Sequence, residues 1–434
     1  MTNWKEEYRR KLVSADELAA KIRSKDKLSL GGGNNEPRAF LEALAARKDN
    51  LEGVILYQML NVFPHKIFSP GMEDHVMYNS MYLTGPAKKV VQEGRGVYTP
   101  VHFSQIPLFL NKYISVEWDA TGVSPPNEYG YFSYSLDGCP YNLPTARTTR
   151  NVVVSVNKNL PFVYGDTMMH VSDVDYIIED TYPMIAMPDN EPTEVEKGIG
   201  ANIAELIEDE STIQLGFGGI PDAVASFLTE KKDLGVHTEM ISTNMVRLYK
   251  KGVITNRKKT FNINKMVGSF AWGSMELYEF LRENPNAELY PITYTNVLPN
   301  IVKNNKMVSV NSALEVDLTG QVCAESIGTL FFSGTGGIYD FARGALEAED
   351  GKGKGIIALE STAKKDTISR IVVTLQSGAV VSVPRTDVDH VVTEYGVARL
   401  RGKSARERAN ELINIAHPSF RDELRSNAKK INLL

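Results

Sequence analysis

Two stretches of the chain share one pattern of apolar and polar positions. The first is KLSLGGGNNEPRAFLEALAARKDNLEGVILYQ, at 27–58, and the second is TIQLGFGGIPDAVASFLTEKKDLGVHTEM, at 212–240. Each begins with a short apolar run, passes through a glycine turn and a proline, and continues as an amphipathic segment before a second apolar run. The pattern predicts a strand, a tight turn, a helix with proline in its first turn, and another strand.

The two stretches also match each other residue by residue. Leu30 and Gly31 correspond to Leu215 and Gly216. A strand–helix–strand unit predicts a parallel sheet, because the helix returns the chain to the same edge. Two such units far apart in the sequence therefore predict two structurally related α/β domains with mainly parallel sheets.

The expected boundary between these domains lies in AMPDNEPTEVEKGIGANIAELI, where prolines precede a predicted helix. We expect one domain at 1–188 and the other at 189–434. Farther along, SGTGGIYDFARGALEA predicts another glycine turn entering a helix, and SRIVVTLQSGAVVSVPRTDVDHVVT predicts a hairpin and a strand.

The second stretch carries a lone carboxylate, Glu239, at the end of its second strand. Aligning Val54 with Val236 places Tyr57 opposite Glu239, so the first copy lacks the acid. One interpretation is a solvated or salt-bridged surface residue, since the chain has 53 acidic residues. The other is a reactive group beside the glycine turn.

Composition limits the classes of protein to which the chain can belong. Hydrophobic residues make up 42% and charged residues 23%, and the net charge of −5 favours no broad nucleic-acid surface. No apolar run is long enough for a membrane span, and the charged N-terminus lacks a signal-peptide pattern. Cys139 and Cys323 form no CxxC pair, which favours buried packing in a reducing compartment. We expect a cytoplasmic protein with neither nucleic-acid nor membrane partners.

A glycine turn entering a helix offers backbone N–H groups and the positive end of the helix dipole to a phosphate, a carboxylate or a developing oxyanion. The alternative is a tight structural connection. GFGGIP is neither a dinucleotide fingerprint nor a Walker A sequence. The chain also lacks GxSxG and HExxH, so we expect no metal. His237 favours a positioning or packing role over that of a base.

A carboxylate nucleophile fits the remaining chemistry. Positioned and partly desolvated, it can attack an activated carbonyl such as a thioester. The products are a mixed anhydride and a thiolate, which can then form a thioester with the enzyme. A second acid reverses these steps, so the scheme requires only one ionised carboxylate and an oxyanion hole.

Five segments together resemble the acetyl-CoA hydrolase/transferase group of family I CoA-transferases. They are GFGGIPDAV, GVHTEM, NSALEVDLTGQVCAES, SGTGGIYDFARGA and VVTEYGVARLRGKSARERANELINIAHPSFRDEL. Within the group, the 4-hydroxybutyrate CoA-transferases look most similar. The resemblance implies two α/β domains of similar fold with the active site between them, and a homodimer. It also implies ping-pong transfer of CoA between short-chain acids, such as 4-hydroxybutyrate or butyrate with acetyl-CoA or acetate.

The same resemblance implies site residues. Glu239 would be the catalytic residue that carries coenzyme A, the substrate, as a glutamyl-CoA thioester. The residues implied to contact acyl-CoA or its oxyanion are Gly216, Phe217, Gly218, Gly219, Ile220, Asn311, Leu314, Gly336, Gly337 and Lys364. HTEMISTN departs from the usual family continuation at Thr243-Asn244, which leaves the acyl pocket and the identity of the acids open.

Other interpretations remain open at this stage. Water could resolve the enzyme thioester, which would make the protein an acyl-CoA hydrolase. A non-catalytic acyl-CoA or sugar-phosphate sensor is a more distant alternative. The basic cluster Lys250, Lys251, Arg257, Lys258 and Lys259 could meet CoA phosphates or be a solvated face. The aromatic run YGYFSYS favours packing over an acyl pocket.

Overall fold

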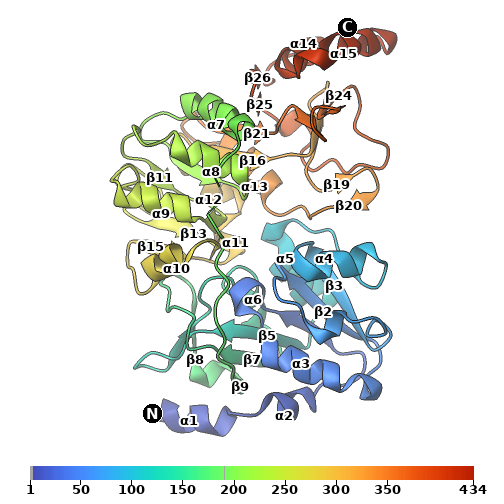
Figure 1. Cartoon of the computed structure of the whole chain (residues 1–434). Helices are drawn as coiled ribbons and strands as arrows, with labels where there is room; N and C mark the ends of the chain where they lie inside the picture. Colours follow the sequence, from blue (N-terminus) through green and yellow to red (C-terminus); the bar gives the residue numbers. More distant parts are fainter. Residues whose placement is uncertain (1–2, 190) are drawn as a thin grey trace. The chain divides into compact units, whose positions relative to one another are not determined.

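The computed structural model describes residues 3–189 and 191–434. The chain forms two compact units, of which the first contains the residues up to Met187 together with Gly268–Tyr294. The second contains Pro188–Val267 and Thr295–Leu434. Figure 1 follows this course by colour along the chain. The pattern of hydrophobic residues does not predict that Gly268–Tyr294 packs in the first unit.

The first unit is built on a seven-stranded parallel sheet with the order β4-β3-β2-β1-β5-β7-β9. In that order the strands are Val97–Tyr98, Val76–Tyr82, Val54–Met59, Lys27–Leu30, Trp118–Val123, Asn151–Val156 and Tyr176–Glu179. Its helices include α1 (Trp4–Lys11), α2 (Ala15–Ala19), α3 (Arg38–Ala46), α4 (Gly85–Gln92), α5 (Ile106–Leu108), α6 (Asn142–Ala146) and α10 (Met275–Leu281). Leu28, Leu56 and Phe40 are fully buried in its core.

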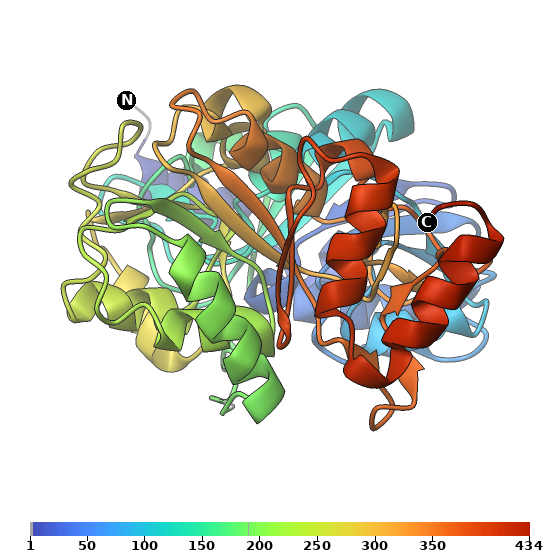
Figure 2. The same cartoon turned by 90° about the horizontal axis from the view of Figure 1, so that it is seen from above.

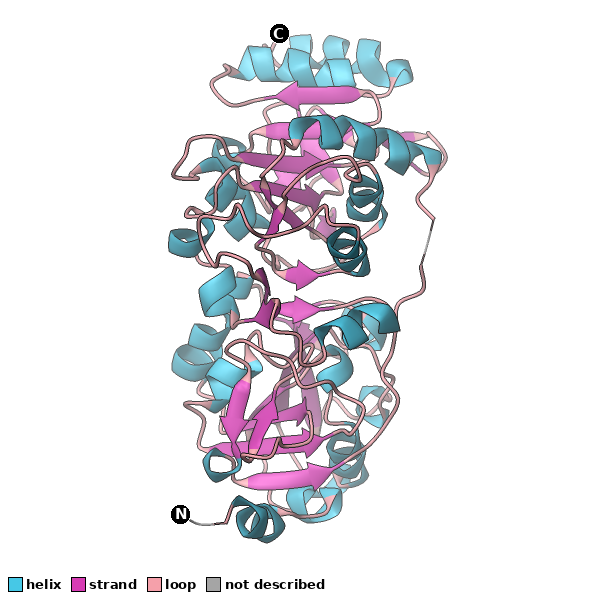
Figure 3. Ribbon diagram, turned by 90° about the vertical axis from the view of Figure 1, so that its left-hand side faces the viewer, coloured by secondary structure: helices cyan, strands magenta, loops and turns pink. Residues whose placement is uncertain are grey.

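The second unit contains a six-stranded sheet with the order β11-β10-β16-β21-β25-β26. These strands are Gly235–Val236, Thr212–Leu215, Val308–Ser312, Lys354–Ala358, His390–Thr393 and Gly396–Arg399, and only β26 runs antiparallel to its neighbour. Helices lie on both sides of the strands in each unit (Figure 3). The predicted α/β class with mainly parallel sheets is confirmed.

Helices of the second unit include α7 (Glu194–Leu206), α8 (Gly219–Ser226), α9 (Thr243–Lys250), α12 (Leu298–Ile301), α13 (Ile338–Leu346), α14 (Ala405–Ile415) and α15 (Pro418–Lys430). The last two form the charged tail and lie side by side at the chain's end (Figure 2). Ser404 begins α14 with a capping box, in which its hydroxyl accepts from the Glu407 N–H while the Glu407 carboxylate accepts from the Ser404 N–H.

Both predicted strand–helix–strand units are present as β1-α3-β2 and β10-α8-β11, each with parallel strands. Their registers correct the alignment made from sequence. Leu28 pairs with Leu56, and the corresponding Ile213 pairs with Val236. The counterpart of Glu239 in the first unit is therefore Met59 rather than Tyr57. The two-residue error arises because loops between elements tolerate length changes that strands do not.

The hairpin expected around 371–383 is absent from the described structure. Ile371–Val372 forms β24, which pairs in parallel with β17 (Glu315–Asp317), and Val383 forms an isolated bridge with Val322. The apolar run therefore lies against the β17-β18 pair, whose second strand is Val322–Cys323. Alternation of apolar residues predicted extended chain here but could not identify its partner.

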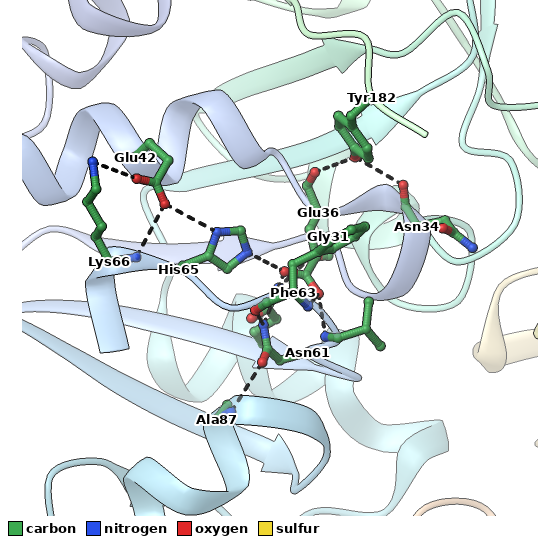
Figure 4. A network of polar contacts seen from close by, with 12 residues as sticks. Gly31, Asn34, Glu36, Glu42, Asn61, Phe63, His65, Lys66, Ala87 and Tyr182 are labelled. Atoms are coloured by element: carbon green, nitrogen blue, oxygen red, sulfur yellow. Dashed lines mark hydrogen bonds and ion pairs between the residues drawn. The ribbon is translucent and has the colours of Figure 1, made fainter. Parts of the chain in front are cut away.

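A fully buried glutamate, Glu36, joins the loops that follow β1 and β2 (Figure 4). Its carboxylate accepts hydrogen bonds from the N–H groups of Val62 and Phe63, at 2.6 and 3.4 Å, and from Asn61 Nδ2 at 3.1 Å. His65 Nε2 lies 2.6 Å from Glu36 Oε2, the oxygen that also accepts from Asn61. Burial raises the pKa of Glu36, and the His65 contact opposes that shift. Four donors therefore surround this carboxylate, which fixes both loops.

The aromatic run from Tyr129 to Ser135 mostly packs into the protein, because Phe132 and Tyr134 are fully buried while Tyr129 and Tyr131 remain exposed. Both cysteines are buried and free. Within the described ranges, no helix combines the length and the apolar character needed to cross a bilayer.

Candidate active site in the second unit

The candidate site lies where three neighbouring strands of the second sheet end. The glycine turn follows β10, Thr238 and Glu239 follow β11, and Asn311 lies near the end of β16. From β10 the chain continues to β11 on one side, and from β16 it continues to β21 on the other, so the strand order reverses between β10 and β16. Ligands of open α/β sheets bind beyond the carboxyl ends of strands at such a point.

Glu239 lies in a bend between β11 and β12 (Met240–Ile241) and keeps part of its surface exposed. Its Oε2 atom accepts a hydrogen bond of 2.7 Å from Asn296 Nδ2. Thr295 Oγ1 in turn donates to Asn296 Oδ1 at 2.9 Å, which fixes the amide with its N–H₂ group toward the glutamate. The carboxylate is therefore oriented by one neutral donor.

Gly337, at the start of α13, lies against the same carboxylate. A Cβ atom at this position would lie 1.8 Å from Glu239 Oε2 and 2.4 Å from Asn296 Nδ2, so any side chain here would displace both groups. The backbone of Gly336 is left-handed, with φ of +56°. Both predicted residues of this second glycine turn are thus buried, and Gly337 is in direct contact range of Glu239.

The surroundings of Glu239 disfavour its charged form. Burial of the carboxyl is the main cause that raises its pKa to about 8, and the charge of Asp340 contributes in the same direction. The Asn296 hydrogen bond acts in the opposite direction. At pH 7 the unliganded site therefore holds mostly the carboxylic acid, and the carboxylate becomes the major form above about pH 8.

The first glycine turn is shaped by close backbone approach. Gly216 N–H donates to the carbonyl of Val310 at 2.9 Å, and Gly218 adopts a φ of +121° before α8 begins. Ile220 is buried in the helix, whereas the Phe217 ring is 62% exposed. A Cβ on Gly219 would overlap the Glu196 carboxylate, at 1.8 Å. The glycines thus leave the backbone of the turn uncovered by their own side chains where α8 begins, as the sequence predicted.

Asn311 and Leu314 occupy different environments. Asn311 is buried and exchanges two hydrogen bonds of 3.1 Å with Gln214, so its amide fastens β16 to β10. Leu314 lies just beyond β16, is partly buried, and donates its N–H to the carbonyl of Cys323 at 2.8 Å. Asn311 is near the glycine turn, since a Cβ on Gly216 would lie 3.4 Å from its Oδ1 atom.

The surroundings of Lys364 differ from those of Asn311 and Leu314. It is exposed in the turn between β22 (Thr362–Ala363) and β23 (Ile368–Ser369) and has a positive φ of 50°. Within the described ranges it makes no hydrogen bond to any other candidate.

The residues of the basic cluster at 250–259 differ in burial. Lys259 is only 3% exposed and donates to the carbonyls of Val236 and Lys265. Lys259 is therefore neither a solvated residue nor a free phosphate contact.

His237 precedes Glu239 by two residues and is completely buried. Burial and the nearby charge of Lys259 together lower its pKa to about 3, against an opposing contribution from the Thr295 hydrogen bond. The ring is therefore neutral at physiological pH. This finding agrees with a positioning or packing role and disfavours that of a general base.

Two residues near Glu239 escaped prediction. Asn296 directly follows α11 (Ile292–Thr295), in the segment TYTN, which matches no motif, and Asp340 lies on the first turn of α13. The polar character of TYTN was the only available signal. Among the described residues, no group of three or more histidine, cysteine, aspartate or glutamate side chains is arranged to hold a metal ion.

Two domain models of one protein family and several characterised proteins match the chain. The acetyl-CoA hydrolase/transferase N-terminal domain model matches residues 1–188, and the C-terminal domain model of the same family matches 273–428. The 4-hydroxybutyrate coenzyme A transferase of Clostridium kluyveri is 44% identical, with 98% of this chain and 99% of that protein covered. The succinyl-CoA:cyclohexane-1-carboxylate CoA transferase of Geobacter metallireducens is 45% identical, with 99% and 98% covered.

A solved structure extends the similarity to the fold. The crystal structure of 4-hydroxybutyrate CoA-transferase from Porphyromonas gingivalis superposes with a TM-score of 0.85 at 38% identity, covering 99% of this chain and 100% of that one. The two relatives and the solved structure extend over the candidate site as well as the two sheets, whereas the two family models leave residues 189–272 unmatched. The chain belongs to the acetyl-CoA hydrolase/transferase family.

Proposed function

We propose that this protein transfers CoA between short-chain carboxylic acids, with Glu239 as the covalent carrier. Family membership and the full-length relatives support CoA transfer as the activity. The main support for Glu239 is its position: Asn296 donates a hydrogen bond to its carboxylate, which occupies the space where a side chain on residue 337 would lie. A partly exposed carboxylate with one neutral partner remains able to react.

The proposed reaction proceeds through balanced steps. Once deprotonated, a Glu239 oxygen attacks the acyl-CoA carbonyl carbon, the C–S bond breaks, and CoA leaves as a thiolate. The thiolate attacks the glutamyl carbonyl of the resulting anhydride and releases the donor acid as a carboxylate. Glutamyl-CoA remains, and an acceptor carboxylate reverses both steps. No net proton or electron is transferred.

Two groups can stabilise the oxygen that becomes negative during these attacks. Asn296 Nδ2 already donates to the Glu239 carboxyl and can donate to the oxyanion that forms on the glutamyl carbon. Gly337, the residue directly before α13, provides backbone close to the same oxygen. The turn from Gly216 to Ile220, with the exposed Phe217 ring, is the proposed acyl-CoA contact. Asn311 and Leu314 would support its wall.

Lys364 stays a prediction as a CoA contact, as do the division at 188/189, the homodimer and the cytoplasmic location. The physiological acids are also a matter for experiment. Relatives of similar identity carry names with different acids, and a pocket discriminates a methylene or a hydroxyl by only ~1–3 kcal/mol. The proposed substrates are therefore the class of short-chain carboxylates, with 4-hydroxybutyrate, butyrate and acetate as first choices.

Acceptor dependence tests the proposed activity. Butyryl-CoA is incubated with and without acetate, and butyryl-CoA, acetyl-CoA and free CoA are measured over time. Transfer predicts acetyl-CoA formation that requires acetate, with parallel lines in double-reciprocal plots because the mechanism is ping-pong. Loss of butyryl-CoA to free CoA at a rate independent of acetate would identify a hydrolase. Binding without turnover of any acyl-CoA would identify a sensor.

A further inference from the structure

His237 lies on the same segment as Glu239, two residues upstream and beneath the protein surface. Its ring is fully buried, with ring centroids 6.1 Å from Phe261 and 6.2 Å from Phe341. Its backbone is held by Ile213, whose carbonyl accepts from the His237 N–H at 3.3 Å. Both ends of this residue are thus fixed within the second unit.

In the described part of the chain, the imidazole ring of His237 makes one hydrogen bond. Nε2 lies 2.9 Å from the carbonyl oxygen of Thr295, and a carbonyl only accepts, so Nε2 carries the proton. Nδ1 is then a buried acceptor, and it has no partner among the described residues. A phenyl ring would fill this apolar space without an unpaired nitrogen, so packing alone does not explain an imidazole here.

The accepting carbonyl belongs to the peptide that joins Thr295 to Asn296. The next residue, Asn296, donates to Glu239 Oε2 at 2.7 Å. Two consecutive hydrogen bonds therefore connect the same two segments: His237 to the Thr295 carbonyl, and the Asn296 side chain to Glu239. Together they form a two-point clamp, which fixes both the distance between the segments and the rotation of the Thr295–Asn296 peptide.

We infer that His237 is a positioning residue for the transfer reaction, which holds the Thr295–Asn296 peptide so that the Asn296 amide meets the Glu239 carboxylate. It acts through Asn296 and touches no substrate. This inference rests on the proposed role of Glu239. Loss of the first bond frees the peptide to rotate, and the second bond then lengthens or breaks. Misplacement of a reacting group by about 1 Å can reduce turnover by about 100-fold.

A matched pair of variants tests the clamp. His237→Phe keeps an aromatic ring but removes the donor, whereas His237→Gln offers an amide N–H near the position of Nε2. We expect His237→Phe to lower kcat by about 10- to 100-fold with KM for acyl-CoA within about threefold. His237→Gln should recover most of the loss. Leu412→Ala, in the buried core of α14, provides a control of reduced stability away from the site.

The pH profile supplies a readout that mere destabilisation does not move. The Asn296 bond lowers the pKa of Glu239, while burial and Asp340 raise it. Breaking the clamp should therefore shift the rise of kcat/KM to higher pH in His237→Phe. The same rise should stay in place in His237→Gln and Leu412→Ala. The imidazole of His237, with its pKa lowered to about 3, stays neutral over pH 6–9 and does not contribute to the shift.

The outcomes separate this inference from the proposed function. Wild-type kcat and pH profile in a folded His237→Phe protein would overturn the clamp, as would a His237→Gln protein that is folded but equally impaired. In both cases Glu239→Gln would still be inactive if Glu239 is the carrier. Full exchange activity in Glu239→Gln would instead overturn the proposed function, whatever the His237 variants do.

Discussion

Glu36 and Glu239 both lie beyond the carboxyl ends of strands in the two related strand–helix–strand units, but their surroundings differ. Glu36 is fully buried and accepts from Asn61, from the N–H groups of Val62 and Phe63, and from His65. Glu239 keeps part of its surface exposed, and in the described part of the chain it accepts only from Asn296.

This difference separates a structural carboxylate from a reactive one. Burial raises the pKa of both groups. At Glu36 the lone pairs are occupied by four donors, including an imidazole, and so the group fastens loops. At Glu239 one amide orients the group, and the remaining lone pairs are free to attack an electrophile. The comparison predicts that isosteric amides at the two positions will have opposite effects on activity and stability.

The largest expected effect is that of Glu239→Gln on turnover. An amide cannot form the anhydride or the thioester, so CoA exchange between butyryl-CoA and acetate should fall by at least about 10⁴-fold. The free energy of unfolding should stay within about 0.5 kcal/mol or increase, because a carboxyl group whose charged form is disfavoured is replaced by a neutral group of equal shape. Exchange kinetics and urea titration measure the two quantities.

Glu36→Gln should show the reverse behaviour. The N–H₂ group of the glutamine would point at N–H donors that the Glu36 carboxylate now accepts from, so at least one of these buried donors would lose its acceptor. Such a loss lowers the free energy of unfolding by about 2–5 kcal/mol. Turnover per folded molecule should change by less than about fivefold. Glu42→Gln is the matched control, since its carboxylate is 39% exposed and lies 3.8 Å from the same histidine. A wild-type urea midpoint in Glu36→Gln would contradict the comparison.

Gly337→Ala tests whether the reactive carboxylate, Glu239, requires the space beside Gly337. Its methyl group would occupy the position of Glu239 Oε2 and displace both the carboxylate and Asn296. We expect kcat to fall by about 100-fold with the fold intact. Gly198→Ala, on α7, is the control, because its Cβ would meet nothing closer than 3.4 Å. Equal kcat values for the two variants would show that Gly337 does not border the reacting group.

The pH dependence is the mildest test. Attack requires the carboxylate, and the pKa of Glu239 is raised to about 8. We therefore expect kcat/KM for acyl-CoA to rise about tenfold per pH unit below this value and to level above it. Glu36 titration should not appear in this profile. A kcat/KM that is flat from pH 6 to 9 would show that the unliganded enzyme holds Glu239 ionised.

Much of the fold follows from local pattern. The matched segments at Leu30 and Leu215 predicted both parallel units, and the family resemblance is confirmed by the models that match each half of the chain. Strand–turn–helix signals are local, so one sequence suffices to read them. That Glu239 follows the second strand of its unit was predicted in the same way.

What could not be predicted depends on contacts distant in sequence. Asn296 reaches Glu239 from the segment after α11, and no periodicity links the two residues. Lys259 is buried because the carbonyls of Val236 and Lys265 accept its ammonium protons, an arrangement that composition cannot indicate. The partner of β24 was also missed, because alternation specifies an extended segment but not its neighbour.

Trapping the enzyme thioester is the most direct test of Glu239 as the carrier. The protein is incubated with butyryl-CoA, treated with hydroxylamine, and digested with trypsin, which releases residues 233–247 as one peptide. Mass spectrometry should find a hydroxamate on Glu239 that depends on butyryl-CoA and is absent from Glu239→Gln. A CoA-dependent hydroxamate on any other residue, with Glu239 unmodified, would contradict the account.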